Sequence, residues 1–274
     1  MQEALVGLAG STGTTSGGAT GTAVFFAPDR FTFGTPLYRS ALEAAIQQRH
    51  SKTHPFSDAW VTGRLDRRLL GEWTKQHYHY VSHFSEWLGT VFGSCQHDDV
   101  RHFLAENIFE EEGFAAGAGF PAVRHTDLLL DFGEHCGMGR KEILEAQLNG
   151  ELLPETLGLQ SWCYRQAQRP AIEALAGLLV GLESQVPQIY SRTTPPLLEK
   201  YGFTEEEVVF FRLHIVADQE HGERGFEILE QHATTPELQA SCVRLVREAT
   251  MMRRLYLDGL YDKFLAPKAA QAAN

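Results

Sequence analysis

Cysteine is scarce in this sequence, and long apolar runs are absent from it. The 274 residues contain four cysteines, with no CxxC pair and no zinc-knuckle spacing. We therefore expect reduced, mostly buried thiols at Cys95, Cys136, Cys163 and Cys242. No apolar run reaches the roughly 18 residues of a membrane span, and the N-terminus lacks the basic start and apolar stretch of a secretory signal. The expected compartment is the cytoplasm.

Positive charge is also in short supply. The chain has 24 Lys and Arg against 35 Asp and Glu, a formal net charge of -11, which argues against nonspecific binding to nucleic acid or to an anionic membrane. Partners are therefore expected to be small molecules or proteins. A hydrophobic content of 43% is enough to bury a core. Twelve histidines beside these carboxylates could supply metal ligands, although most such residues in any protein are solvated.

The N-terminal segment has almost nothing to bury. Residues 10–23 read GSTGTTSGGATGTA, a composition typical of a flexible arm. A phosphate-binding loop is the alternative, but no GxxxxGK[ST] sequence and no preceding strand support it. We expect a flexible Gly/Ser/Thr-rich arm over residues 1–35, one domain over 36–266 and a flexible tail over 267–274.

The rest of the chain has helical periodicity. Apolar residues recur at spacings of three and four between widely separated prolines, which predicts an all-α bundle. Asp66, Thr204 and Thr235 are expected N-caps, the second with Glu207 in a capping box. The predicted helices cover residues 37–49, 66–92, 97–112, 122–137, 139–148, 155–166, 169–193, 204–231 and 235–264.

The most informative segment is FFRLHIVADQEHGERGF, residues 210–226. His214, Asp218 and His221 stand at i, i+4 and i+7, so their side chains fall within about 60° of one another on a helix. Phe210 and Phe211 beside them indicate a buried helix, where unpaired polar groups are costly. A metal ion is the favoured way to satisfy this stripe, and a dense hydrogen-bond network is the alternative.

One helix supplies only part of a two-metal site, so further ligands are expected from other helices. Glu183 lies within the apolar helix LVGLESQVPQIY, where a carboxylate needs a cation or donors; a buried ion pair is the alternative. The acidic run at residues 110–112 ends one predicted helix, and His125 begins the next. A solvated turn is the alternative for the three glutamates.

Two other polar stripes have ligand-like spacing. The first, in KQHYHYVSHFSEW, is flanked by aromatic residues and is interpreted as pocket lining or packing. The second lies on a charged helical face and is interpreted as solvent-exposed, because a ferritin-like site would need paired ExxH motifs. The stripes are His79, His83 and Glu86, and Asp99, His102 and Glu106.

The combination of NIFEEEG followed by His125, then LESQVP, then HIVADQEH resembles the heme-oxygenase-like diiron oxidases and oxygenases. These iron-containing redox enzymes are related to the thiaminase-like TenA proteins, the PQQ-synthesis oxidase and the chlamydial para-aminobenzoate synthases. The resemblance covers about residues 38–260. It implies an all-α, heme-oxygenase-like up-and-down bundle of about seven core helices, and a homodimer.

The resemblance also implies a ligand set for two Fe(II) ions. Glu111 is chosen over its neighbours because it follows Asn107 by four residues, as in the family pattern N-L-x-x-E. Three carboxylates and three neutral imidazoles would leave two Fe(II) ions with a charge of about +1, and this mixed oxygen and nitrogen set suits iron. The implied ligands are Glu111, His125, Glu183, His214, Asp218 and His221.

The chain departs from its relatives in two places. The linker GFAAGAGFP between Glu111 and His125 is longer than expected. In the chlamydial para-aminobenzoate synthases, a tyrosine and a lysine take part in self-sacrificing chemistry. Ser57 and Thr193 occupy the corresponding positions here, so that activity is not expected.

The leading hypothesis is a non-heme diiron enzyme that uses O2 and an external electron donor to oxidise a small molecule, such as an amino acid or amine derivative, in biosynthesis. N-oxygenation is slightly favoured over desaturation and oxidative C–C cleavage. A redox partner protein is a further expectation. The alternatives are a cofactor-free PQQ-type oxidase on the same fold and a noncatalytic metal-binding helical protein. The substrate depends on pocket shape, which spacing does not reveal.

Overall fold

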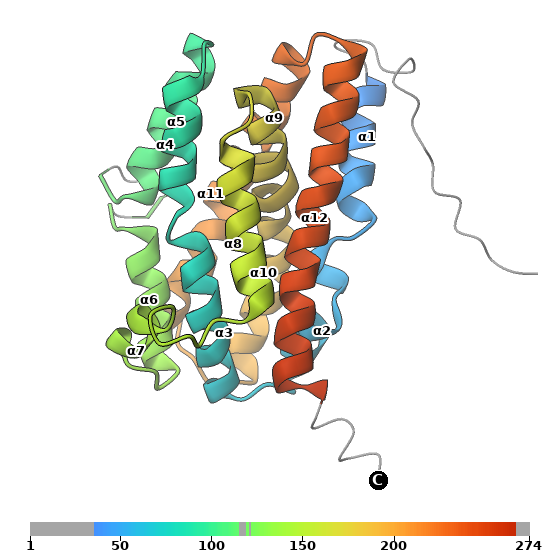
Figure 1. The fold of residues 1–274 in the computed structure, drawn as a ribbon. Helices are drawn as coiled ribbons and strands as arrows, with labels where there is room; N and C mark the ends of the chain where they lie inside the picture. The colour runs from blue at the N-terminus through green and yellow to red at the C-terminus, as the bar shows by residue number, and fades with distance from the viewer. Residues whose placement is uncertain (1–35, 115–118, 121, 267–274) are drawn as a thin grey trace, which may run out of the picture.

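The computed structural model describes residues 36–114, 119–120 and 122–266, and this part of the chain is a bundle of helices with no strand (Figure 1). The predicted arm and tail lie outside the described residues. The α-helices are α1 (Pro36–Gln47), α2 (Pro55–Val61), α3 (Arg67–Val81), α4 (Phe84–Ser94), α5 (Asp98–Glu111), α6 (His125–His135), α7 (Arg140–Glu145), α8 (Pro154–Ala167), α9 (Ala171–Leu175), α10 (Val186–Glu199), α11 (Val209–His232) and α12 (Pro236–Phe264). Between α9 and α10 run a π-helical segment (Ala176–Leu182) and a short 3-10 turn (Glu183–Gln185).

The all-α prediction is confirmed, but several details of the predicted helices are wrong. The expected helix 66–92 is broken between α3 and α4, where His83 has φ -99° and ψ 6°. Its Nδ1 lies 3.0 Å from Glu86 Oε2 and 2.9 Å from the Tyr164 hydroxyl, which stabilise the break. Helix α2, which begins at Pro55 with the His54 side chain as N-cap, was not predicted at all.

The predicted caps at Asp66 and Thr235 form as expected, whereas the capping box at Thr204 precedes the 3-10 turn Glu206–Val208, and α11 begins only at Val209. Asp66 accepts a hydrogen bond from the amide of Leu69, and Thr235 accepts one from the amide of Leu238. The amide of Thr204 donates to Glu207, whose own amide donates back to the Thr204 hydroxyl. These side chains satisfy amides that the first helical turn leaves without partners.

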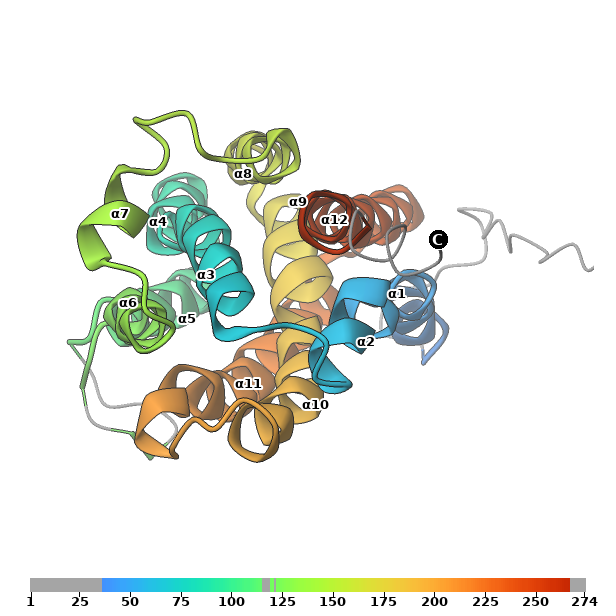
Figure 2. The same ribbon diagram turned by 90° about the horizontal axis from the view of Figure 1, so that it is seen from below.

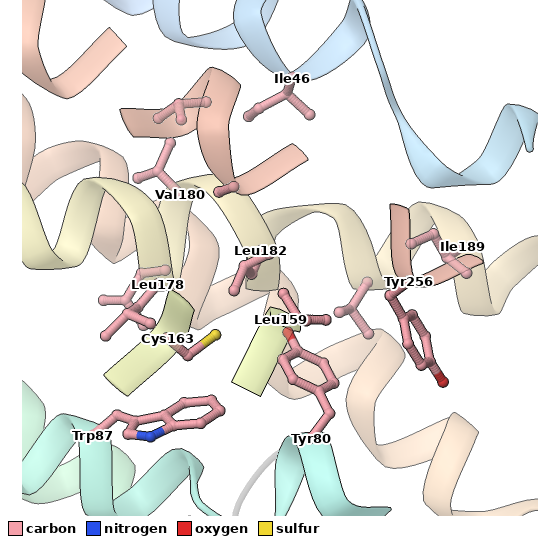
Figure 3. Close-up of a cluster of buried hydrophobic side chains, with 14 of the residues drawn as sticks. Ile46, Tyr80, Trp87, Leu159, Cys163, Leu178, Val180, Leu182, Ile189 and Tyr256 are labelled. Carbon is pink, nitrogen blue, oxygen red and sulfur yellow. The ribbon is translucent and has the colours of Figure 1, made fainter. Parts of the chain in front are cut away.

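The continuous run from α9 to α10 lies in the middle of the bundle, with α8 and α12 on one side of it and α11 on the other (Figure 2). Every residue of the π-helical segment is buried, because its sequence AGLLVGL is apolar on all faces. Figure 3 shows Leu178, Val180 and Leu182 packed among side chains that include Trp87 and Tyr80. The central run is therefore held from several sides.

The four cysteines are buried and unpaired, in agreement with the sequence prediction. In the described ranges, no helix is both long enough and apolar enough to cross a membrane.

Acid should destabilise the protein partly through His50. This residue is 1% exposed, its Nδ1 accepts from the Lys52 amide, and its Nε2 has no partner. Burial, with the nearby charges of Lys52 and Arg253, lowers the pKa of His50 to about 3. The unfolded chain therefore binds a proton that the native chain does not, and stability is lost as the pH falls from about 6.5 toward 3.

Urea unfolding across this pH range measures the effect. H50N keeps a side-chain acceptor for the Lys52 amide but removes the titrating ring, so the pH slope of its unfolding free energy should fall by up to about 1.4 kcal/mol per pH unit. The exposed His102 provides the control, because H102N should keep the wild-type slope. An unchanged slope in H50N would contradict the assignment.

Candidate metal centre

Helix α11 carries three candidate ligands on its inner face. Asp218 and His221 are 3% and 4% exposed, and His214 is partly buried. His214 Nδ1 lies 2.6 Å from the carbonyl oxygen of Phe210, to which it donates when protonated. That hydrogen bond leaves Nε2 as the basic nitrogen, and burial lowers the pKa of His214 to about 4. A neutral imidazole with one free nitrogen is the form that binds a metal ion.

Glu183 comes from the central run, directly after the π-helical segment. π-Helical turns inside α-helices are rare and are frequent at functional sites. Here the Gln185 side chain donates to the Gly181 carbonyl, and the Ser184 hydroxyl donates to that of Val180. These bonds satisfy carbonyls at the change of helix type, while the Glu183 carboxylate reaches His221 Nδ1 at 2.9 Å.

The end of α5 and the start of α6 bring Glu111 and His125 together. Glu111 Oε1 lies 3.1 Å from His125 Nδ1, despite the long linker between them. Gly113 makes this approach possible: its φ is +75°, and a Cβ there would lie 2.5 Å from the Arg124 amide nitrogen. Only glycine allows both the left-handed backbone and the contact between the two chain segments.

Five of the six predicted ligands form two overlapping groups. In one, Glu111 joins His125 and His214; in the other, Glu111 joins Glu183 and His221. Within each group the potential ligand atoms lie within 4.8 Å of one another. Because Glu111 belongs to both groups, it is placed to contribute to two neighbouring metal positions.

Asp218 belongs to neither group, and its Oδ1 lies 3.9 Å from His221 Nδ1. This oxygen and Glu183 Oε2 are buried without hydrogen-bond partners. Burial, followed by the nearby carboxylates, raises the pKa of Asp218 well above its ordinary value, and burial also raises the pKa of Glu183. Buried carboxylate oxygens without donors are costly, and a cation satisfies them, so the donor set fits a pair of divalent metal ions.

The acidic run at residues 110–112 is not a solvated turn. Besides Glu111, Glu110 faces the site, with Oε2 3.1 Å from His221 Nε2. Burial lowers the pKa of His221, but the hydrogen bonds that its ring donates to the Glu110 and Glu183 carboxylates outweigh burial and raise the pKa well above its ordinary value. Glu112 instead pairs with Arg124 at 2.9 Å. Glu110 belongs to the acidic run named from the sequence but was not selected from it, because adjacent residues on a helix normally face different directions.

A cavity lies against these groups. Apolar side chains dominate its wall, among them Phe84, Val186 and Phe210. His77 and Arg253 also line it, and neither was singled out from the sequence. Both continue buried helical stripes: His77 follows Leu70 and Trp73, and Arg253 lies between Val246 and Leu260 at seven-residue spacings. A polar residue on such a stripe is the signal that could have found them.

The two competing stripes behave as predicted. His79 is buried against the Ile143 carbonyl, with Nε2 at 2.7 Å, and the break before α4 separates it from His83. Asp99, His102 and Glu106 are all exposed. Neither stripe joins the candidate metal groups among the described residues.

The sequence model of the iron-containing redox enzymes matches residues 71–254 of the chain. The chain belongs to this family. Its matched region includes every predicted ligand, so the family relation and the geometry of the site concern the same residues.

Relatives support both the family and the fold. The chain is 27% identical to a 4-aminobenzoate synthase of Chlamydia muridarum, over 82% of this chain and 89% of the relative. It is 23% identical to a pyrroloquinoline-quinone synthase of Acidiphilium cryptum, over 83% and 89%. A Shewanella denitrificans domain with a heme oxygenase-like fold superposes with a TM-score of 0.65 at 18% identity, over 83% of this chain and 90% of that domain. The heme oxygenase-like fold is thus confirmed.

Proposed function

We propose that this chain is a non-heme diiron oxidase or oxygenase that oxidises a small molecule with O2 and an external electron donor in a biosynthetic pathway. The observation that carries this proposal is the pair of largely buried ligand groups that share Glu111, four of whose five members line a cavity. The proposed iron ligands are Glu111, His125, Glu183, His214, Asp218 and His221. An amino acid or amine derivative is the proposed substrate, with N-oxygenation ahead of desaturation and C–C cleavage.

The protein groups around the iron ions have distinct roles in this proposal. The carboxylates neutralise cationic charge, and the imidazoles bind through neutral nitrogens. When one nitrogen of His221 binds iron, the other still faces a carboxylate, because Glu110 and Glu183 flank the ring on its two nitrogens. Such a partner orients the ring and increases its basicity. The iron pair itself would supply the binding and reductive activation of O2.

The activity for which the 4-aminobenzoate synthase relatives are named is not proposed for this chain. Ser57 and Thr193 line a small cavity that shares His77, Tyr190 and Arg253 with the larger one. Their hydroxyls donate to the carbonyls of Ser51 and Ile189. A serine and a threonine supply neither the phenol nor the amine of the corresponding residues in the chlamydial enzymes, so the substrate is expected to enter from solution.

Anaerobic iron loading followed by mixing with O2 tests the proposed function. The wild-type chain should retain two Fe(II) ions and, in a stopped-flow spectrometer, show a visible absorbance change that depends on O2. H214A and E183A should abolish this change and keep a helical circular-dichroism spectrum. H102A serves as the matched control, because His102 belongs to the exposed stripe on α5. A wild-type chain that retains no iron, or that shows no change with O2, would contradict the proposal.

A further inference from the structure

One cation lines the cavity beside the candidate iron ligands. Among the described residues of the cavity wall, Arg253 is the only lysine or arginine. It lies on α12, on the side of the cavity formed by the central run, and it is 6% exposed. Cationic side chains are almost never buried this deeply without a partner, since removing the charge from water is costly.

The partner expected for a buried guanidinium is a carboxylate, but none lies within 4.0 Å of Arg253 in the described part of the chain. Its Nη1 donates to the carbonyl of Leu182 at 2.8 Å, and this is its one hydrogen bond to the described residues. A guanidinium has five N–H donors. The Leu182 bond thus orients the side chain and leaves most of its donors without a protein acceptor.

The candidate iron ligands do not explain this cation. Two Fe(II) ions already exceed the charge of the three proposed carboxylate ligands by about one unit. Arg253 raises the local charge to about +2, and the Glu110 carboxylate brings it back to about +1. With iron bound, the cavity therefore has a positive charge that the protein leaves unbalanced, and an anionic ligand would balance it.

The rest of the cavity wall indicates the chemical character of the part of the ligand that does not carry the negative charge. Val81, Phe84, Leu182, Val186 and Phe210 make most of the lining apolar. Tyr80 also lines the cavity, and its hydroxyl has no hydrogen-bond partner in the described part of the chain. Figure 3 shows Tyr80 reaching from α3 into this region of the core. The wall thus combines an apolar surface with two sets of free donors.

We propose that Arg253 binds the carboxylate of the substrate, and that the substrate is a small monocarboxylic acid with an apolar or aromatic body. This assignment rests on the proposed function, because the positive charge of the cavity depends on bound iron. The planar guanidinium can bind a carboxylate through two parallel hydrogen bonds. The apolar wall holds the body of the substrate between Arg253 and the iron ligands.

Calorimetric titration of the Fe(II)-loaded chain under nitrogen tests the assignment with simple probes. Hexanoate and phenylacetate are each compared with their neutral amides. The wild-type chain should bind each carboxylate about 10- to 100-fold more tightly than its amide, which corresponds to one charged hydrogen-bonded pair. R253Q should lose this preference, whereas R253K should keep part of it. R244Q, which removes the same charge from an exposed position on α12, should behave as wild type.

Iron content is measured on every sample before the titration, so the two proposals fail in different ways. If the wild-type chain contains no iron, the proposed function is overturned, and so is the proposed binding of a substrate carboxylate by Arg253. A fully loaded wild-type chain that does not prefer carboxylates overturns only the role of Arg253. Undiminished preference in fully loaded R253Q also overturns it, because the carboxylate would then bind iron directly. If R253Q does not fold, R253K is used in its place. A reduced preference of R253K for the carboxylate over its amide supports the role of Arg253, and a preference equal to that of the wild type overturns it.

Discussion

Replacing Glu111 with alanine should remove both iron ions, whereas replacing His214 or His221 should remove one. Glu111 is common to both ligand groups, while His214 belongs to one and His221 to the other. Loss of a single ligand from a group of three leaves too few donors to hold the ion, whereas the other group keeps its set. Iron per chain, measured after anaerobic loading and desalting, should be near zero in E111A and about half the wild-type value in H214A and H221A.

The neighbouring glutamate provides the control for this experiment. Glu112 follows Glu111 directly but pairs with Arg124 and faces away from the ligand groups. E112A should therefore retain the wild-type iron content. Equal iron loss in E111A, H214A and H221A would show that the two positions fill only together. Full iron retention in E111A would refute the shared ligand.

A methyl group at Gly181 should destabilise the fold strongly. Gly181 lies in the π-helical segment where α12 crosses it, and a Cβ there would lie 2.4 Å from the Cβ of Ala249. Closely packed backbones cannot yield without moving α12, so G181A should lower the free energy of unfolding by about 1–3 kcal/mol. Since Arg253 on α12 bonds to Leu182, the same shift should disturb the cavity. Urea unfolding at neutral pH measures the loss.

Two variants test whether the loss of stability in G181A comes from the contact with Ala249. G181A/A249G transfers the methyl group across the contact and should recover most of the lost stability. Gly89 lies in α4 with no atom within 4 Å of its missing Cβ, so G89A should raise stability by about 0.5–1 kcal/mol through helix propensity. If G181A is as stable as the wild type, the two helices are not in close contact at this point.

The fold class followed from local information, but the helix boundaries did not always do so. Periodicity of three and four located most helices, and capping residues such as Asp66 and Thr235 marked their starts correctly. The break between α3 and α4 escaped prediction because His83 is stabilised by Tyr164, which lies 81 residues away in the chain. The π-helical segment also escaped, since its hydrogen-bond pattern differs from that of an α-helix while its composition does not.

Spacing predicted the candidate site only where the residues share one helix. His214, Asp218 and His221 were found from their spacing alone. Glu183, His125 and the acidic run at residues 110–112 were candidates from their local sequence, and the family resemblance selected Glu111 from the run and joined the six residues into one ligand set. Neither source selected Glu110 from the acidic run, although its side chain reaches His221 from a position next to Glu111. Arg253 was also missed, because its burial and lack of a carboxylate partner depend on packing between α12 and the central run.

By itself, the sequence determined that the chain folds as an all-α bundle and that one helix presents three metal-binding side chains on one face. These features depend on residues a few positions apart, whose geometry follows from the helical repeat. Only the tertiary structure decided that Glu111 is shared by two ligand groups and that, among the described residues, Arg253 is the one buried Lys or Arg lining the cavity. Those features depend on segments far apart in the chain, and packing alone sets the distances between them.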